Sequence, residues 1–404
     1  MKIQTLDDVE TEEKTVLMRA DFNSPIDPAT GEITDSTRIR GHVETVNDLA
    51  DAKLVILAHQ GRPGDSDFVT LEQHAEILNG LVRQAVEYMP DILGPAAKAA
   101  IRDLSEGEVL VLENVRFLSE EVLNRPPEVQ KETMLVKSLT PLCDLFVNDA
   151  FAAVHRSQPS IVGFPMVMPS VAGRLMQKEI EVLENVLEGD RRPQIFVLGG
   201  AKFNGALGLI KHVLEHGIAD KVLVSGVIGN LFLIGRGYEL GKSCEFIEQN
   251  ASHKLIDEAK ALIAEYGNRI ETPVDFAVGA DGGRVEHTVN DLPDEHQIFD
   301  IGEGTIAIQS REIRNAGTIV ANGPPGRFED PEFELGTKSL LSAMVGTRGH
   351  TVIGGGHVIA AAAKYHIADG IYYVSTGGGA MMEFLSGKEL PALTALKMAA
   401  ERQR

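Results

Sequence analysis

The chain has 404 residues, 43% of them hydrophobic, which is enough for two domains with separate cores and too apolar for a disordered chain. Its formal net charge of -21 argues against nucleic acid or an anionic membrane as a partner, so an anionic ligand must meet a local group of basic side chains. Cys143 and Cys244 lie among apolar neighbours, no signal-peptide pattern is visible, and no apolar run approaches the ~20 residues of a membrane span, which together favour a cytoplasmic protein.

Short apolar strands alternate with helical patterns along the chain, which predicts an α/β fold with parallel sheets covered by helices on both faces. The expected strands are residues 15–18, 54–57, 108–112, 145–147, 195–198, 221–224, 274–278, 318–321, 351–353 and 372–374.

Between the fourth and fifth of these strands, residues 169–188 place apolar side chains at helical spacing. We expect this helix to begin at Pro169-Ser170, to end at Gly189 and to join two domains. The predicted organisation is two Rossmann-like αβα domains of three layers each, at 1–170 and 190–383. A hinge helix at 171–189 joins them, and residues 384–404 pack back on the first domain.

Charged residues follow the strands of the first half. They are Asp21, Asn23 and Arg38 after the first strand, His59 and Arg62 after the second, Arg116 after the third, and Arg156 after the fourth. In open parallel sheets the ligand binds beyond the carboxyl ends of the strands, so these side chains are expected to converge. A single surface arginine is ordinarily solvated or ion-paired. Five basic groups at corresponding positions of an acidic chain indicate a small polyanionic substrate.

Glycine runs follow the strands of the second half. They are Gly199-Gly200, Gly354-Gly355-Gly356 and Gly377-Gly378-Gly379. Exposed backbone N–H groups next to a helix N-terminus bind phosphate well, because unsatisfied donors and the helix dipole both favour an anion. One such turn is weak evidence, but three in one half indicate a nucleotide site. Together the two halves predict a phosphotransferase, which needs positioning, charge neutralisation and exclusion of water.

In these features the chain resembles phosphoglycerate kinase. The resemblance covers nearly the whole chain in collinear order, through Arg19-Ala20-Asp21-Phe22-Asn23, Asn322-Gly323-Pro324-Pro325-Gly326, and residues 59–63, 112–117, 148–156, 172–176, 198–202, 354–356 and 375–380. It implies reversible phosphoryl transfer between ATP and 3-phosphoglycerate with Mg²⁺, in a cytoplasmic monomer.

The resemblance also implies roles for individual residues. Asp21, Asn23, Arg38, His59, Arg116 and Arg156 would hold phosphoglycerate, Arg62 would lie beside it, and Arg38 would be catalytic. Lys202, expected to be catalytic as well, would contact the nucleotide phosphates, and Glu329 would contact the ribose. Gly199, Gly200, Gly323, Gly354, Gly355, Gly356 and His357 would complete the nucleotide site, with Mg²⁺ held mainly by the phosphates.

The nucleotide half departs from the family pattern at two places. Ala206 stands where the family has a second lysine, and His357 where it has an aspartate associated with Mg²⁺, which is similar to archaeal-type members. Arg174 and Arg327 occupy positions that are commonly apolar in the family. Either guanidinium is a candidate replacement for the lost lysine, and the alternative for each is a surface ion pair with a nearby acid.

Four other interpretations compete with a kinase. His212 and His216 spell an inverted zinc-peptidase pattern, but Gly217 ends the helix at once. Residues 237–243 resemble a Walker A loop that is one residue short and has no strong helical pattern after Ser243. No clean Gly-x-Gly-x-x-Gly turn supports a dehydrogenase. A non-catalytic nucleotide sensor would suit the missing lysine but not the intact set of arginines.

Overall fold

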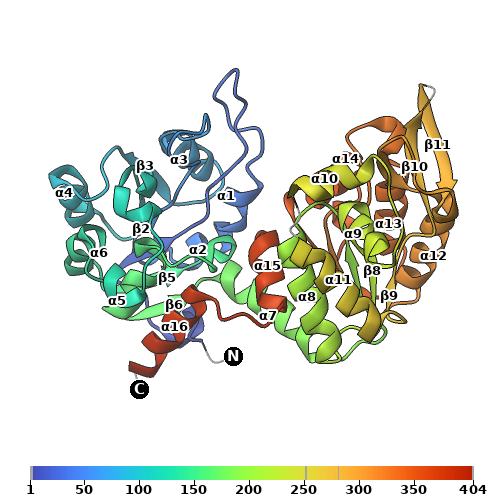
Figure 1. Cartoon of the computed structure of the whole chain (residues 1–404). Coiled ribbons are helices and arrows are strands. Elements are labelled where there is room, and N and C mark those ends of the chain that lie inside the picture. Colours follow the sequence, from blue (N-terminus) through green and yellow to red (C-terminus); the bar gives the residue numbers. More distant parts are fainter. Residues whose placement is uncertain (1–2, 251–252, 281, 403–404) are drawn as a thin grey trace. The chain divides into compact units, whose positions relative to one another are not determined.

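The computed structural model describes residues 3–250, 253–280 and 282–402. The chain forms two compact units, one of residues 1–181 and 389–404 and the other of residues 182–388 (Figure 1). We describe each unit separately. Their boundaries differ from the expected domain limits, because 171–181 belong to the first unit and 384–388 to the second.

The first unit is built on a parallel six-stranded sheet of order β3-β4-β2-β1-β5-β6. Its strands are β1 (Thr15–Arg19), β2 (Lys53–Leu57), β3 (Ala85–Met89), β4 (Glu108–Leu112), β5 (Leu145–Asn148) and β6 (Ser170–Ala172). Its helices are α1 (Thr37–Gly41), α2 (Val43–Asp48), α3 (Glu72–Asn79), α4 (Pro95–Asp103), α5 (Pro127–Gln130), α6 (Met134–Leu139) and α16 (Pro391–Arg402).

Alternation of side chains along these strands produces two cores, one on each face of the sheet. Val16 and Met18 of β1 pack with Ile39 of α1, whereas Leu17 of the same strand packs with Ile101 of α4. The sheet is therefore the middle of three layers, as the sequence predicts.

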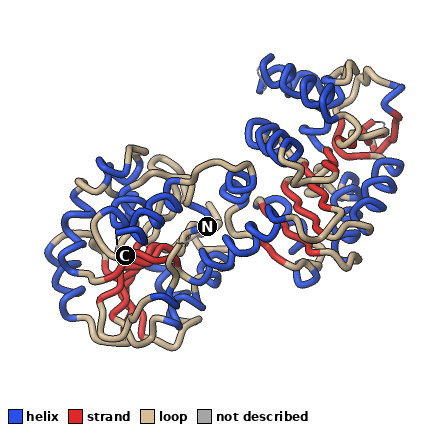
Figure 2. Tube along the Cα trace, turned by 90° about the horizontal axis from the view of Figure 1, so that it is seen from below, coloured by secondary structure: helices blue, strands red, loops and turns tan. Residues whose placement is uncertain are grey.

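The second unit is built on another parallel six-stranded sheet, of order β15-β14-β13-β7-β8-β9. Its strands are β7 (Gln194–Leu198), β8 (Lys221–Val224), β9 (Ile270–Glu271), β13 (Thr318–Asn322), β14 (His350–Gly354) and β15 (Tyr373–Val374). Its helices are α8 (Phe203–Glu215), α9 (Gly226–Gly235), α10 (Ser243–Asn250), α11 (His253–Tyr266), α12 (Glu303–Arg314), α13 (Leu335–Val345), α14 (Gly356–Lys364) and α15 (Gly378–Leu385). In each unit the strands lie between helices (Figure 2). The predicted fold class, two αβα units with parallel sheets, is confirmed.

A small antiparallel sheet in the second unit was not expected. It has the order β11-β10-β12 and consists of β10 (Asp275–Ala280), β11 (Gly283–Thr288) and β12 (Ile298–Ile301). The sequence predicts a strand at 274–278 but places it in the parallel sheet. Strand β11 is largely polar and β12 has only four residues, so neither has an apolar pattern long enough to reveal it.

Helix α7 (Arg174–Glu188) links the two units, and its start corrects the sequence prediction. Residues Ser170–Ala172 are not helical but form β6, which pairs with β5 and is fully buried. Val171 therefore contributes to the sheet and not to an amphipathic helix face. The helix ends at Glu188, and Gly189 follows with φ +69°, a conformation that suits glycine at a helix C-terminus.

Candidate active site

The residues predicted to bind substrate in the first unit lie together at the carboxyl ends of β1, β2, β4 and β5. Arg38, from α1, forms an ion pair with Asp21. His59 Nδ1 lies 3.8 Å from the other carboxylate oxygen of Asp21, and Arg156 Nη1 lies 3.5 Å from His59 Nε2. Arg116 donates to the carbonyl oxygen of Gly61. Topology explains this convergence, since neighbouring parallel strands all end at one edge of the sheet.

Asn23 and Arg62 flank this group in different ways. The side-chain oxygen of Asn23 accepts a hydrogen bond from the Gly61 amide at 2.8 Å, which joins the loops after β1 and β2. Gly61 has φ +65°, and a Cβ there would meet the Asp67 carbonyl oxygen at 2.4 Å, so only glycine fits this turn. Arg62 is exposed, but its charge acts on both Arg116 and Arg156.

Arg19 lies in the interior of the first unit next to His59, and the sequence analysis assigned it no role. Its guanidinium is fully buried and donates to Ser160 Oγ at 2.8 Å, while its Nη2 lies 3.0 Å from His59 Nδ1. Ser160 in turn donates to Glu121, which is also buried. A buried charge is tolerated only with such partners. The network therefore holds the Arg19 guanidinium in place, and Arg19 in turn contacts His59.

The electrostatics of the group favour an anion. Burial, followed by the charges of Arg19, Arg116, Arg156 and Arg38, holds the pKa of His59 well below its ordinary value. Burial and the charges of Arg156 and Arg19 lower the pKa of Arg116 to about 10. Burial also lowers the pKa of Arg156. Burial is the largest cause of each shift, and the positive charge of neighbouring arginines adds to it, so a bound anion would offset local positive charge.

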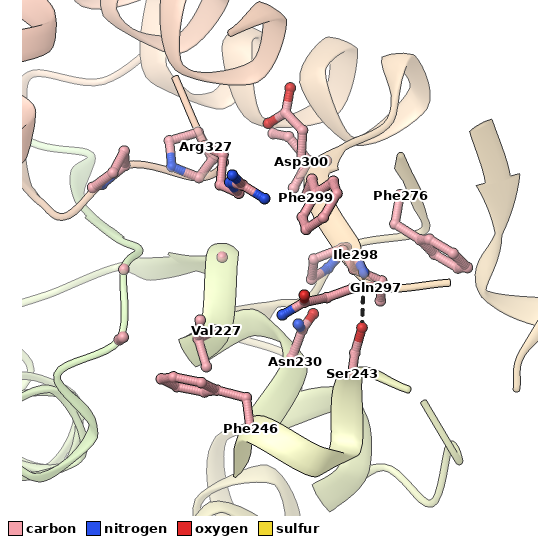
Figure 3. Close-up of a pocket in the computed structure, with 18 of the residues that line it drawn as sticks. Val227, Asn230, Ser243, Phe246, Phe276, Gln297, Ile298, Phe299, Asp300 and Arg327 are labelled. Atoms are coloured by element: carbon pink, nitrogen blue, oxygen red, sulfur yellow. Dashed lines mark hydrogen bonds between the residues drawn. The ribbon is translucent and has the colours of Figure 1, made fainter. Parts of the chain in front are cut away.

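In the second unit, a cavity of about 340 Å³ opens at the carboxyl edge of the sheet (Figure 3). Its lining includes Gly200, Glu329 and His357 of the predicted nucleotide site, together with Arg327. Lys202, Gly199, Gly323 and the Gly354–Gly356 run lie outside this lining, although Gly354 ends β14 and Gly356 begins α14.

Glycines allow the loops beside this cavity to approach very closely. A Cβ on Gly323 would lie 2.2 Å from the Gly199 carbonyl oxygen, and one on Gly226 would lie 2.9 Å from the Gly200 amide. The N-termini of α8, α9 and α14 therefore follow β7, β8 and β14 at one edge of the sheet. This is the arrangement in which unsatisfied N–H groups bind phosphate.

Several residues of this cavity were missed by the sequence analysis. Figure 3 shows the amides of Asn230 and Gln297 close together, Phe246 beside Val227, and the Ser243 hydroxyl accepting from the Ile298 amide at 2.8 Å. They come from α9, α10, β12 and the residue before β12, and of them only Ser243 belongs to a motif considered above, the Walker A-like loop. The apolar side chains with a few convergent polar groups suit a planar, polar ligand such as a nucleobase.

The two arginines considered as charge replacements have different surroundings. Arg174 is held in the first unit by Asp7 at 2.8 Å and Asp48 at 2.5 Å, which is the surface ion pair considered as the alternative. The guanidinium carbon of Arg327 lies 4.4 Å from the centre of the Phe299 ring, and no carboxylate pairs with it among the described residues.

Two competing motifs can be compared with the structure. A helix does follow Ser243, since α10 begins there, so the expectation of no helix was wrong. The 237–243 loop nevertheless follows helix α9 and not a strand, so it lacks the strand–loop–helix context of a Walker A motif. His212 and His216 lie close together, with ring centroids 4.2 Å apart, but no described group of three or more His, Cys, Asp or Glu side chains is placed to hold a metal ion.

Comparison with known proteins agrees with the resemblance stated above. The phosphoglycerate kinase family model matches residues 6–388. The chain belongs to the phosphoglycerate kinase family. It is 50% identical over 399 residues to the phosphoglycerate kinase of Methanothermobacter thermautotrophicus, covering 98% of this chain and 97% of that one. It is 43% identical over 407 residues to that of Sulfurisphaera tokodaii, covering 99% and 97%.

Solved structures of phosphoglycerate kinases give the same result. The structure from Pyrococcus horikoshii superimposes with a TM-score of 0.92 at 42% identity, covering 99% of this chain and all of that one. The structure from Coxiella burnetii gives 0.82 at 31% identity, with complete coverage of both. The phosphoglycerate kinase family is a family of kinases that use ATP or ADP as a substrate. Among the described residues, no helix is both long and apolar enough to cross a bilayer.

Proposed function

We propose that this chain transfers a phosphoryl group reversibly between ATP and 3-phosphoglycerate, giving ADP and 1,3-bisphosphoglycerate. The observation that carries the proposal is the basic group of the first unit, in which His59, Arg116 and Arg156 surround the Asp21–Arg38 pair on a chain of net charge -21. Family membership and the cavity of the second unit supply the nucleotide half.

The acceptor in this reaction is a carboxylate, which is ionised near pH 7 without help from a general base. One carboxylate oxygen forms a bond to the γ-phosphorus while the bond from that phosphorus to the bridging oxygen of ADP breaks. The chain therefore needs no covalent nucleophile, and its work is to position both anions and to reduce their repulsion.

The proposed roles follow the chemistry of each side chain. Arg116, Arg156 and neutral His59 bind the phosphate of phosphoglycerate, Asp21 and Asn23 accept from its hydroxyl group, and Arg62 adds to the local field. Arg38 neutralises charge on the transferring phosphoryl group. Direct transfer requires the acceptor to meet the γ-phosphate, so the proposal includes closure of the two units about α7.

In the second unit we propose that Lys202, the Gly200 turn that precedes α8, and the N-terminus of α14 at Gly356 bind the phosphates. Gly199, Gly323, Gly354 and Gly355 allow the close approach of these loops, and Glu329 binds the ribose. Because no described cluster of side chains could cage a cation, Mg²⁺ would enter with the nucleotide and be held mainly by its phosphates, where it would reduce their negative charge. His357, which lines the cavity, would lie beside them.

The test is an assay of ADP formation from ATP and Mg²⁺, with and without 3-phosphoglycerate. We expect turnover only with phosphoglycerate, and a nucleotide sensor would show none. Arg38→Ala should lower kcat by about a thousandfold or more, as loss of a phosphoryl-directed arginine does. The side chain of Arg40, on the same helix, donates to Ser36 Oγ at 3.1 Å and has no other partner among the described residues, so Arg40→Ala is the matched control and should retain wild-type activity. Equal activity of the two variants would contradict the assignment of Arg38.

We also propose that the kinase is a cytoplasmic monomer. Both cysteines are free, and burial raises the pKa of Cys143 to about 12, so this thiol is unreactive and suited to a reducing compartment. Light scattering of the purified protein at assay concentration tests the oligomeric state.

A further inference from the structure

A second basic site lies at the opposite edge of the sheet in the second unit, where the strands begin. A depression of about 660 Å³ is lined there by four arginines and one acid, Asp190. We name these arginines the amino-edge cluster, and they are Arg191, Arg192, Arg314 and Arg348. On a chain with 59 acidic and 38 basic residues, such a local excess of positive charge runs against the average composition.

Sheet topology brings the cluster together. Strands β7, β13 and β14 are parallel neighbours, so the connections that lead into them lie side by side. Arg191 and Arg192 precede β7, Arg314 ends α12 before β13, and Arg348 precedes β14. The predicted nucleotide residues of this unit follow strands and so lie at the other edge, which makes the cluster separate from the cavity described above.

Hydrogen bonds join the three connections that carry the cluster. The Gly317 amide donates to the Pro193 carbonyl at 2.8 Å, and the His350 amide donates to the Gly317 carbonyl at 2.9 Å. The Thr318 hydroxyl donates to the Arg191 carbonyl at 3.0 Å. A Cβ on Gly349 would lie 2.4 Å from the Ala316 carbonyl oxygen, so the connections touch. The arginines therefore project from a fixed base and not from three independent loops.

Three of the four guanidinium groups have no ion-pair partner in the part of the chain that the structure describes. Arg192 pairs with Asp220 at 3.1 Å and donates to the Gly217 carbonyl at 2.8 Å. Arg191, Arg314 and Arg348 have no carboxylate partner among the residues that the structure describes. All three are exposed, so their guanidinium groups are accessible to an anion with two or more negative groups.

A smaller cavity of about 230 Å³ adjoins this depression and shares Arg191 and Asp190 with it. His350 and Tyr372 stack in its wall with ring centroids 4.0 Å apart. Burial and the charge of Arg191 lower the pKa of His350, so its ring is neutral near pH 7 and adds an uncharged aromatic face beside the arginines.

From this arrangement we propose that the amino-edge cluster binds a small polyanion carrying at least two phosphate groups. Arg191, Arg314 and Arg348 supply the charged donors, and Arg192 stays committed to Asp220. This second site does not depend on the proposed catalytic function.

The test is calorimetric titration of the full-length protein with tripolyphosphate. The variant Arg314→Gln/Arg348→Gln removes two of the free guanidinium groups, and Arg102→Gln/Arg311→Gln removes two exposed arginines that lie outside the depression. Any binding of the probe to the catalytic site is common to all three proteins. At saturating substrates both variants should keep wild-type kcat, which shows that they are folded.

We expect the wild type and the control to bind tripolyphosphate at this site. In Arg314→Gln/Arg348→Gln, which lacks two charged hydrogen-bond donors, binding of tripolyphosphate there should be lost or at least about tenfold weaker. That loss, with the control unchanged, supports the proposal. Equal isotherms for the two variants overturn it, and so does a wild type whose binding is abolished completely by saturating ATP and phosphoglycerate.

Discussion

His42 and Asp149 form a buried hydrogen bond next to the loop that carries Asp21, with 2.7 Å between His42 Nδ1 and Asp149 Oδ2. The same oxygen accepts from the Thr45 hydroxyl at 2.8 Å, and the second carboxylate oxygen accepts from the Met176 amide at 3.2 Å. On its other side, His42 Nε2 accepts from the Asp21 amide at 2.9 Å. Through His42, Asp149 thus connects Asp21, which pairs with Arg38, to the first turn of α7.

Replacing Asp149 with alanine should therefore affect both stability and substrate binding. Three buried donors would lose their acceptor, so we expect the free energy of unfolding of the first unit to fall by about 3–5 kcal/mol. The KM for phosphoglycerate should rise, because the amide of Asp21 loses its fixed partner. Urea unfolding followed by circular dichroism and steady-state kinetics measure the two effects. Asp103→Ala, at an exposed carboxylate, is the control, and a change no larger than in that variant would contradict the role of Asp149.

Arg327 and Arg174 should respond differently to substitution by alanine. We expect Arg327→Ala to lower kcat by more than about tenfold, equal to ~1.4 kcal/mol, and Arg327→Lys to recover part of that loss. Arg174→Ala should keep its kcat and lose only about 0.2–1 kcal/mol of stability for each of its two partly exposed ion pairs. If both alanine variants lose less than about tenfold in kcat, neither arginine replaces the lysine that is absent at Ala206.

Glu329 is expected to act in nucleotide binding and not in the chemical step. Glu329→Gln removes a charged acceptor at the edge of the cavity, which should raise the KM for ATP by about tenfold or more while kcat stays near wild type. Glu332→Gln, at an exposed acid three residues later, should change neither constant. A selective fall in kcat for Glu329→Gln would point to the transition state and away from ribose binding.

His74 should make the first unit sensitive to acid. Its Nε2 lies 3.0 Å from Gln60 Oε1, its Nδ1 is buried with no hydrogen-bond partner among the described residues, and burial lowers its pKa to about 4. In the unfolded chain His74 takes up a proton near pH 6.5, whereas in the folded protein it does so only near pH 4. The contribution of the neutral ring to the free energy of unfolding is therefore complete above pH 6.5 and is lost as the pH falls toward 4. The loss amounts to about 3 kcal/mol.

The variant His74→Gln cannot titrate, so its stability should depend less on pH between 6.5 and 4 than that of the wild type. Urea unfolding at a series of pH values measures this, and an NMR titration of the His74 ring checks the pKa directly. His216→Gln, at an exposed histidine, should keep the wild-type slope. A His74 ring that titrates near 6.5 would remove the basis of this prediction.

Most strands of the parallel sheets were predictable because they are short apolar runs with distinct ends, whereas β3, β6 and β9 were not predicted. The positions of the substrate residues followed from the same fact, since Asp21, His59 and Arg116 come directly after such runs. Sequence reasoning failed where pairing across the chain decides the structure. Val171 fits both a helix face and a strand, and only its place beside β5 makes it part of β6.

The cavity of the second unit also shows how far sequence-based prediction reaches. Its glycines follow strands and carry a local signal, but Asn230, Phe246 and Gln297 come from elements that no motif links. Arg19 was quoted in a motif without a role, because nothing in the sequence shows that Glu121 and Ser160 would surround its guanidinium. Burial and partners of this kind exist only once the chain has folded.

The last helix has a consequence for the order in which the molecule is made. In α16, Leu393, Leu396 and Ala399 are buried in the first unit, and the Ala392 amide bonds to the Val154 carbonyl at 3.1 Å, although over two hundred residues of the second unit intervene. A ribosome must therefore synthesise the whole second unit before α16 can complete the core of the first unit. Until then, the part of the first unit that is already made keeps an apolar surface exposed.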